Sequence, residues 1–256
     1  GVIGSYVVVR KISYIAGAIS HSVLSGIGLA LFLQARYEIM WFTPLLGAMI
    51  TAILSALIIG AASIYARQRE DTVIGAIWAI GMATGILFLA KTPGYVDPMS
   101  YLFGNILIIS KVDLIMIGLL DAVVVTAGIL LYNQFQAVSF DEEFARVRGL
   151  KTGLYYMLIL LLTAFTVVLM VTIVGIVMVI ALLTLPAAVS SLFSKKLWQM
   201  MLFSAFLCMV FTTAGLGFSY VYDSPTGPTI IVFAGLIYLA ALLLKRLLRR
   251  KKLRKH

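Results

Sequence analysis

Two ionisable side chains lie inside long apolar stretches of the chain, where a charge is costly and a polar group is a candidate for function. His21 is flanked by Ser20, Ser22 and Ser25, and the only other histidine is the last residue, His256. A neutral imidazole binds Zn²⁺, Mn²⁺ or Fe²⁺ and can also carry protons. One histidine cannot complete a four-ligand cage, so His21 suits a weak site through which a metal ion passes. The alternative is a histidine hydrogen-bonded across a helix interface.

Asp121 is the second candidate, two turns into another apolar segment that has Asp113 nearer its outer end. A carboxylate at this depth could bind a metal ion or relay protons along the same path as His21. A sequence does not fix the rotation of a helix about its axis, so this grouping of Asp121 with His21 is a hypothesis. The single cysteine, Cys208, excludes a disulfide within the chain and a cysteine-based metal cluster.

The composition places these candidates in a membrane protein. The 256 residues are 62% hydrophobic, whereas globular chains are roughly 45–50% apolar. Apolar stretches of about 20 residues, the length that crosses a bilayer as a helix, recur along the chain. We therefore predict an all-α, polytopic membrane bundle of about nine spans, the first of them truncated, with eight spans as the alternative. The predicted spans are residues 1–9, 14–33, 41–65, 72–90, 112–132, two within 154–193, 198–220 and 229–244.

Proline and glycine punctuate these spans. Residues 91–111 begin with two prolines and a glycine and are then apolar but short, which predicts a partly re-entrant or interfacial helix on the outer side. Gly175 is the predicted outer turn within 154–193, and Pro186 predicts a kink near the inner end of the second helix there. Glycines inside the spans predict close helix packing. These are Gly26, Gly28, Gly81, Gly85, Gly215 and Gly217.

The distribution of positive charge predicts the orientation. Of the 20 Lys and Arg residues, 17 fall in one alternating set of connections, and only Arg36, Lys91 and Lys111 fall in the other. Cytoplasmic connections carry such an excess, so the larger set faces inward, together with the basic tail at 245–256. The net charge of +10 therefore indicates contact with anionic membrane lipid and not a nucleic-acid partner.

A polar segment, residues 140–153 (FDEEFARVRGLKTG), separates two of the apolar blocks. Six of the eleven residues from 141 to 151 are charged, so the segment lies outside the lipid. Ser139 and Glu142 fit a capping box and Gly149 is placed to end a helix of about two turns. Such a helix is too short to be stable alone in water. We predict that it docks against a second protein; the alternative is a solvated loop that rests on its own membrane domain.

The sequence contains no GxxxxGK[ST] phosphate loop and no segment large enough for a soluble nucleotide-binding domain. If the protein drives transport with ATP, the motor is a separate chain.

Six blocks of sequence occur in the order seen in the permeases of zinc/manganese/iron ABC importers, which the chain resembles over nearly its whole length. They are GSYVVVRKISYIAGAISHSVLSGIGLA, REDTVIGAIWAIGMATGIL, SYLFGNIL, FDEEFARVRGL, GIVMVIALLTLPAAVSSL and YDSPTGPTIIV. The resemblance implies one transmembrane domain (1–256) similar to vitamin B12-importer permeases, with a coupling helix at 139–153. It implies a homodimer on two cytoplasmic ATP-binding subunits, in a bacterial or archaeal cytoplasmic membrane. An extracytoplasmic protein would deliver the divalent metal, which is cargo and not a cofactor.

The resemblance also assigns candidate residues. Glu143, Ala145 and Gly149 look like a degenerate form of the EAA motif that contacts the ATPase in ABC importers. His21 matches the intramembrane histidine of the family, but Gly17 stands where many members have an aspartate, which removes a hard oxygen ligand. The set implied to contact the ATPase is Asp141, Glu142, Glu143, Ala145, Arg146 and Gly149.

We therefore predict the membrane subunit of an ATP-driven importer of divalent metal ions that works by alternating access. Three alternatives stay open: an ion-coupled secondary carrier with Asp121 and His21 as its proton relay, a scaffold that does not transport, and an ABC permease for a metal chelate. The sequence leaves the choice among zinc, manganese and iron undecided.

Overall fold

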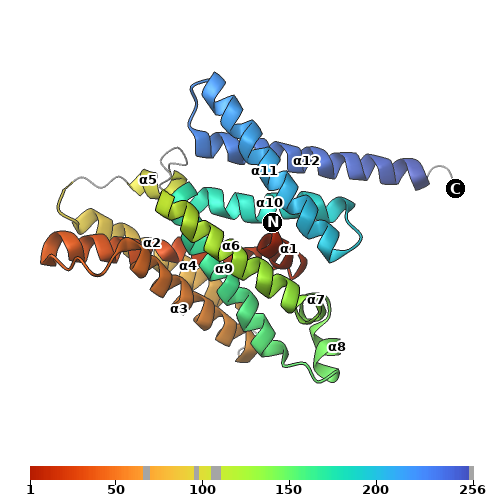
Figure 1. Ribbon diagram of the computed structural model, residues 1–256, viewed down its shortest axis with the longest axis horizontal. Helices are drawn as coiled ribbons and strands as arrows, with labels where there is room; N and C mark the ends of the chain where they lie inside the picture. Colours follow the sequence, from red (N-terminus) through yellow and green to blue (C-terminus); the bar gives the residue numbers. More distant parts are fainter. Residues whose placement is uncertain (66–69, 95–97, 105–110, 254–256) are drawn as a thin grey trace.

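The computed structural model describes residues 1–65, 70–94, 98–104 and 111–253, and every regular element within them is a helix (Figure 1). The helices are α1 (Val2–Val9), α2 (Ser13–Tyr37), α3 (Pro44–Tyr65), α4 (Glu70–Lys91), α5 (Pro98–Phe103), α6 (Lys111–Leu130), α7 (Tyr132–Phe140), α8 (Glu142–Val147), α9 (Thr152–Val174), α10 (Ile176–Phe193), α11 (Leu197–Val221) and α12 (Thr226–Leu253).

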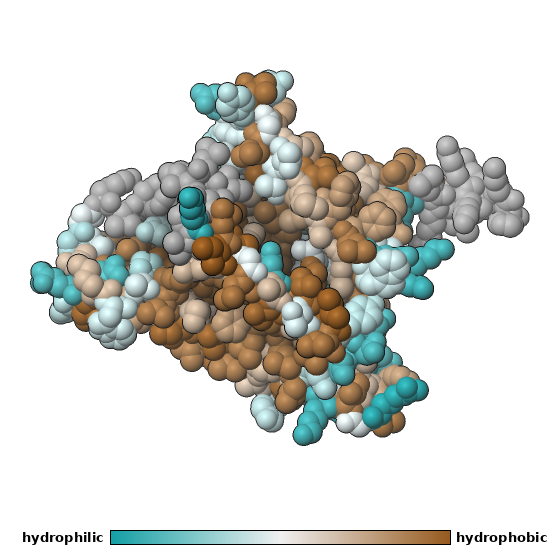
Figure 2. All heavy atoms as spheres, viewed as in Figure 1, coloured by the Kyte–Doolittle hydropathy of each residue, from teal (hydrophilic) through white to brown (hydrophobic). Residues whose placement is uncertain are grey.

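Seven of these helices are long and apolar enough to cross a membrane: α2, α3, α4, α9, α10, α11 and α12. The pair α6 and α7, bent by 75° at the break between them, raises the count to eight if the two helices form one span. Long leucines and isoleucines on these helices point away from the bundle, and Figure 2 shows a hydrophobic band across its middle. The predicted all-α, multi-pass architecture is confirmed. The ninth crossing stays a prediction, because α1 has only eight residues.

The helix that carries His21 is central to the bundle. α2 packs along α4 on one side and α3 on another, and α3 also packs along α9. A second group, α10, α11 and α12, lies against α1 and α9 (Figure 1). The apolar residues buried between these helices form one continuous core, with a small separate cluster between α10, α11 and α12.

Close helix contacts depend on glycine, as the sequence predicted. A Cβ at Gly81 of α4 would lie 2.6 Å from the Cα of Ser22 in α2, and one at Gly85 would lie 2.6 Å from the carbonyl carbon of Leu24. Gly217 has no atom within 4 Å of such a Cβ, so its predicted role is wrong within the described residues. The other predicted contacts are confirmed at Gly26, Gly28 and Gly215.

The turns between helices also follow the sequence closely. Gly175 separates α9 from α10 with φ = 81°, a left-handed conformation that favours glycine. α5 is the short helix predicted for the outer side, although residues 105–110 of that segment lie outside the described residues. Gly104, which follows α5, packs so closely on Gly175 that a Cβ there would meet the backbone of Val174 at 2.3 Å.

Pro186 lies inside α10, which continues without interruption to Phe193, and the kink at this proline stays a prediction. A proline has no N–H, and it leaves the carbonyl four residues earlier without its helical donor. That carbonyl belongs to Leu182, and the thiol of Cys208 in α11 donates to it at 3.8 Å. The single cysteine therefore has a helix-packing role at this position.

Candidate functional site

The intramembrane site is built around His21, eight residues after the start of α2. Its side chain is only 9% exposed and faces α4, where its imidazole stacks on the indole of Trp78. The ring centroids are 4.7 Å apart and the planes are inclined by 19°. The Nδ1 atom is buried and has no hydrogen-bond partner among the described residues. This nitrogen therefore has no protein partner among the described residues, and in this conformation it is closed to solvent.

The neighbouring serines do not occupy this nitrogen. The hydroxyls of Ser20, Ser22 and Ser25 each donate to a carbonyl of α2 itself, at 2.6–2.8 Å. Ser55 of α3 donates to the Ser22 hydroxyl at 2.8 Å. These bonds satisfy the serine hydroxyls within the bundle, and the bond between Ser55 and Ser22 holds α2 against α3. The alternative of a histidine hydrogen-bonded across a helix interface through Nδ1 is not realised within the part of the chain that the structure describes.

The structure does not bring Asp121 to His21. Asp121 is exposed on α6, a helix that packs against α9, α1 and α7, none of which carries His21. Within the described ranges, no group of three or more His, Cys, Asp or Glu residues could hold a metal ion. A role for Asp121 in binding metal or protons therefore stays a prediction.

The second site is the polar segment, where α8 forms a helix of six residues. Asp141 is its N-cap: the residue is extended, with φ = −150°, and its Oδ1 accepts a hydrogen bond from the backbone N–H of Phe144 at 2.9 Å. The predicted capping box of Ser139 with Glu142 is wrong, because α7 continues through Phe140 and Ser139 belongs to it. The acidic cap lies at the positive end of the helix dipole.

Gly149 ends α8 as predicted. It has φ = 81°, and its N–H donates to the carbonyl of Arg146 at 3.0 Å while the N–H of Leu150 donates to that of Ala145 at 3.1 Å. These two bonds form a Schellman motif, which favours a left-handed residue at this position. Ala145 is 1% exposed, so it marks the face of α8 that packs against the rest of the chain.

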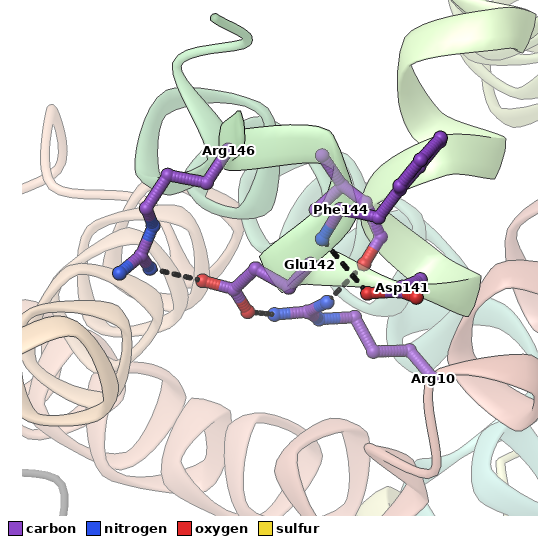
Figure 3. A network of polar contacts seen from close by, with 6 residues as sticks. Arg10, Asp141, Glu142, Phe144 and Arg146 are labelled. Carbon is purple, nitrogen blue, oxygen red and sulfur yellow. Dashed lines mark hydrogen bonds and ion pairs between the residues drawn. The ribbon is translucent and has the colours of Figure 1, made fainter. Parts of the chain in front are cut away.

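Arg10 fixes α8 to the neighbouring helices (Figure 3). Its Nη2 donates to Oε2 of Glu142 at 2.6 Å, and its Nη1 donates to the carbonyl of Val138 in α7. The guanidinium also lies over the ring of Tyr156 in α9, 4.3 Å from its centre. Arg146 donates to the other oxygen of Glu142 at 3.0 Å. One arginine thus joins the α1–α2 connection to α7, α8 and α9.

The electrostatics of Glu142 favour this arrangement. Partial burial of the carboxyl group acts to raise its pKa, but the hydrogen bonds and charges of Arg10 and Arg146 together lower the pKa below its usual value. The carboxylate stays ionised at neutral pH, so both arginines keep their partner. A cavity of about 580 Å³ opens beside this network, between Ser63 at the C-terminal end of α3 and Gly153 at the start of α9.

The opposite face of this segment presents exposed apolar side chains. Phe140, Phe144 and Val147 are 63%, 53% and 86% exposed. Arg148 covers part of the Phe144 ring, with its guanidinium carbon 4.8 Å from the ring centre. Phe144 and Val147 lie in the charged segment outside the candidate spans, and an exposed apolar face in such a segment is typical of a protein contact.

Sequence reasoning misses two residues of these sites. In the sequence, Arg10 is recognised only as one of the positive charges that predict the orientation. Its pairing with Glu142 is not predictable, because the two residues are 132 positions apart. Trp78 is recognised only as part of an apolar span. Its stacking on His21, 57 positions earlier, is not predictable from the sequence. Neither residue belongs to a local motif, and the signal for each is a contact between helices.

Comparison with known proteins identifies the family. The model of the ABC 3 transport family matches residues 1–245. The chain belongs to this family.

Similar proteins with descriptive names support the assignment to the ABC 3 family. A probable metal transport system membrane protein of Chlamydia pneumoniae is 38% identical over 96% of this chain and 84% of its own length. The manganese transport system membrane protein MntC of Listeria monocytogenes is 34% identical over 95% of this chain and 84% of its own length. Among solved structures, PsaBC from Streptococcus pneumoniae in complex with Fab superimposes with a TM-score of 0.84 at 26% identity, covering 98% of this chain and 89% of that one.

Proposed function

We propose that this chain is the membrane permease subunit of an ATP-binding-cassette importer for divalent transition metal ions, in a bacterial cytoplasmic membrane. The observation that carries the cargo assignment is the imidazole of His21, which is buried in a membrane-spanning helix with Nδ1 unpartnered among the described residues. An unpaired buried polar atom is costly, and a passing metal ion would satisfy it. The names of the relatives, which include metal and manganese transport systems, support this cargo.

The surroundings of His21 favour a bare ion over an organic chelate. Trp78 stacks directly on the imidazole, and the close helix contact at Gly81 and Ser22 lies next to it along α2. The cavity of about 580 Å³ is lined by residues at the inner end of the bundle, including Arg10 and Glu142, and His21 is not among them. We therefore keep the divalent ion as the proposed cargo.

A cytoplasmic ATP-binding subunit is the proposed partner of α8. The exposed apolar side chains Phe140, Phe144 and Val147 would enter the contact, while Ala145 faces the permease. Of the residues implied to contact the ATPase, Asp141 and Gly149 delimit the helix, and the side chains of Glu142 and Arg146 pair with each other. We further propose that two copies of this chain assemble on two ATP-binding subunits, and that an extracytoplasmic metal-binding protein delivers the ion.

The proposed mechanism links the two sites through Arg10. Closure of the ATP-binding subunits would move α8 as a rigid body, and the contacts of Arg10 with Glu142 and Val138 would transmit that movement to the start of α2. His21 lies eight residues beyond Ser13, about 12 Å along the helix axis at about 1.5 Å per residue. A change in the angle of α2 would then open the path around His21 alternately to each side.

The function is tested with the permease and its ATP-binding subunit reconstituted together in proteoliposomes. We expect ATP-driven uptake of Mn²⁺ or Zn²⁺ in the wild type, and loss of uptake in His21→Ala, because the intramembrane nitrogen ligand is removed. Ser20→Ala is the matched control, since the Ser20 hydroxyl bonds to a carbonyl of its own helix. Copurification of the ATP-binding subunit should be unchanged in both variants. Wild-type uptake in His21→Ala would remove His21 from the mechanism.

The docking surface is tested by Val147→Asp. Val147 is 86% exposed, so a charge there leaves the fold of the permease intact while it disrupts an apolar contact. We expect the ATP-binding subunit to be lost from the purified complex. Tyr222→Asp, at an exposed residue after α11, is the control and should keep the subunit. Normal copurification with Val147→Asp would refute the proposed contact.

A further inference from the structure

The indole of Trp78 covers one face of the His21 ring. The two planes are inclined by only 19° with centroids 4.7 Å apart, and Trp78 itself is half-buried on α4. A ring stacked in this way cannot rotate about its χ2 angle without losing the contact. Metal ligation uses the nitrogen lone pair in the plane of the imidazole, which stacking leaves free. The contact therefore fixes the direction of Nδ1 without occupying it.

Gly17 makes room for this indole. It lies one turn before His21 on the same face of α2, and a Cβ at this position would come within 2.9 Å of Cζ3 and 3.2 Å of Cη2 of Trp78. Any larger side chain would push the indole away from the imidazole. Gly17, His21 and Trp78 thus form one unit that we call the indole shelf.

The indole shelf determines what an ion at His21 meets on one side. On the side of Gly17 and Trp78 an ion would meet an aromatic wall with no oxygen ligand from either side chain. Mg²⁺ and Ca²⁺ require oxygen ligands, whereas Mn²⁺, Fe²⁺, Co²⁺ and Zn²⁺ accept imidazole nitrogen. The electron-rich face of an indole also stabilises a neighbouring ring that becomes more positive, as imidazole does when it binds a cation.

We propose that Trp78 is a positioning residue of the metal path, which holds the His21 imidazole in its ligating orientation and, with Gly17, restricts the site to divalent ions that accept nitrogen. This inference rests on the proposed function and adds a residue and a selectivity to it. The passing ion is bound next to the indole, so Trp78 is also a built-in reporter of the cargo.

Fluorescence tests the proposal directly, because the chain contains three tryptophans. The variant Trp41→Phe/Trp198→Phe leaves Trp78 as the sole tryptophan and alters two side chains that are 75% and 48% exposed. Co²⁺, a paramagnetic quencher at short range, is added to the complex in nanodiscs, with an ATP-binding subunit whose tryptophans are replaced by phenylalanine. We expect saturable quenching by Co²⁺, no quenching by Mg²⁺, and loss of the saturable phase when His21→Ala is added. Quenching that does not saturate, or that persists without His21, would overturn the proposal.

Transport kinetics provide the second measurement. We expect Trp78→Leu to raise the KM for Mn²⁺ by about tenfold with a smaller change in maximal rate, because the ligand loses its fixed direction. Trp78→Phe keeps an aromatic face and should restore the KM to within about threefold of wild type. Gly17→Val should reproduce the effect of Trp78→Leu by displacing the indole.

The two proposals fail in different ways. A wild-type complex without ATP-driven uptake of any of these ions contradicts the proposed function. Normal uptake in the wild type, together with an unchanged KM in Trp78→Leu, contradicts only the role of the indole shelf.

Discussion

At the scale of single residues, Arg10 contacts three consecutive helices, α7, α8 and α9, that are distant from it in sequence. It donates to a carboxylate of α8 and to a carbonyl of α7, and its planar group stacks on Tyr156. A guanidinium can satisfy these three partners at once because its donors lie in a rigid fork with a flat face. Lysine carries the same charge but has no such geometry. Arg10 is therefore the residue through which, in the proposed mechanism, movement of α8 reaches α2.

We expect Arg10→Ala to separate ATP hydrolysis from transport. The ATP-binding subunit still docks on the exposed face of α8 and hydrolyses ATP, but the number of ions imported per ATP falls by about tenfold, since charge-assisted hydrogen bonds of this kind contribute about 1.5–3 kcal/mol before solvent screening. Lys11→Ala is the matched control, because Lys11 is the adjacent, exposed cation. The ratio of uptake to hydrolysis in proteoliposomes measures the effect, and a normal ratio in Arg10→Ala would exclude this route.

The residue scale also shows where sequence reasoning ends. His21 is identifiable from sequence because a histidine within an apolar span is costly and therefore stands out. Its stacking partner Trp78 cannot be identified in this way, because an aromatic residue within a span looks the same in the sequence whether it faces lipid or another helix. Depth alone groups Asp121 with His21, whereas α6 packs against α9, α1 and α7 and leaves Asp121 exposed.

At the scale of elements, the contact between α2 and α4 positions the candidate metal site. Gly81 lies against Ser22, the residue next to His21, and Gly85 lies against Leu24. Trp78 lies three residues before Gly81, and this spacing of about one helical turn places both on the same face of α4. The close approach at Gly81 therefore brings the indole within reach of the imidazole.

We expect Gly81→Ala to destabilise the protein by about 1–3 kcal/mol, because its new methyl group would meet the backbone of Ser22 and force α2 and α4 apart. Gly75→Ala, in the same helix, is the matched control: nothing lies within 4 Å of a Cβ there, and alanine favours the helix by about 0.5–1 kcal/mol. Thermal unfolding of the purified permease measures both variants. Equal midpoints for the two would show that the close contact at Gly81 contributes nothing.

The elements themselves are largely predictable from sequence, and their ends less so. Long apolar runs indicate the spans because length and hydrophobicity suffice to define them. The sequence pattern places the start of α8 at Ser139, whereas α7 continues through Phe140 and Asp141 supplies the cap. Two residues with capping side chains lie close together, and only the path of the preceding helix decides between them.

At the scale of the whole molecule, charge and fold agree on orientation. α8 and the C-terminal end of α12 lie toward one side of the bundle in Figure 1, and α5 and the α11–α12 connection lie toward the other. The connections on the side of α8 and the C-terminal tail carry 17 of the 20 Lys and Arg residues. This excess predicts that their side of the bundle is cytoplasmic. An ATP-binding subunit can reach α8 only from that side.

Labelling of single cysteines tests this orientation. In a Cys208→Ser background, which removes the one native thiol, we expect Tyr222→Cys to react with a membrane-impermeant maleimide added outside intact cells. Val147→Cys should react only after the membrane is permeabilised. Both positions are well exposed, at 64% and 86%, so accessibility within the protein does not limit either reaction. The reverse pattern would place α8 outside and end the proposed coupling to ATP.

The close fit of Trp78 over Gly17 couples these two positions. Even a bare Cβ at position 17 would lie 2.9 Å from the indole. An acidic side chain there therefore requires the indole to shift away from the imidazole or to be replaced by a smaller group, so a carboxylate at position 17 and the stacked tryptophan are competing solutions for the same space.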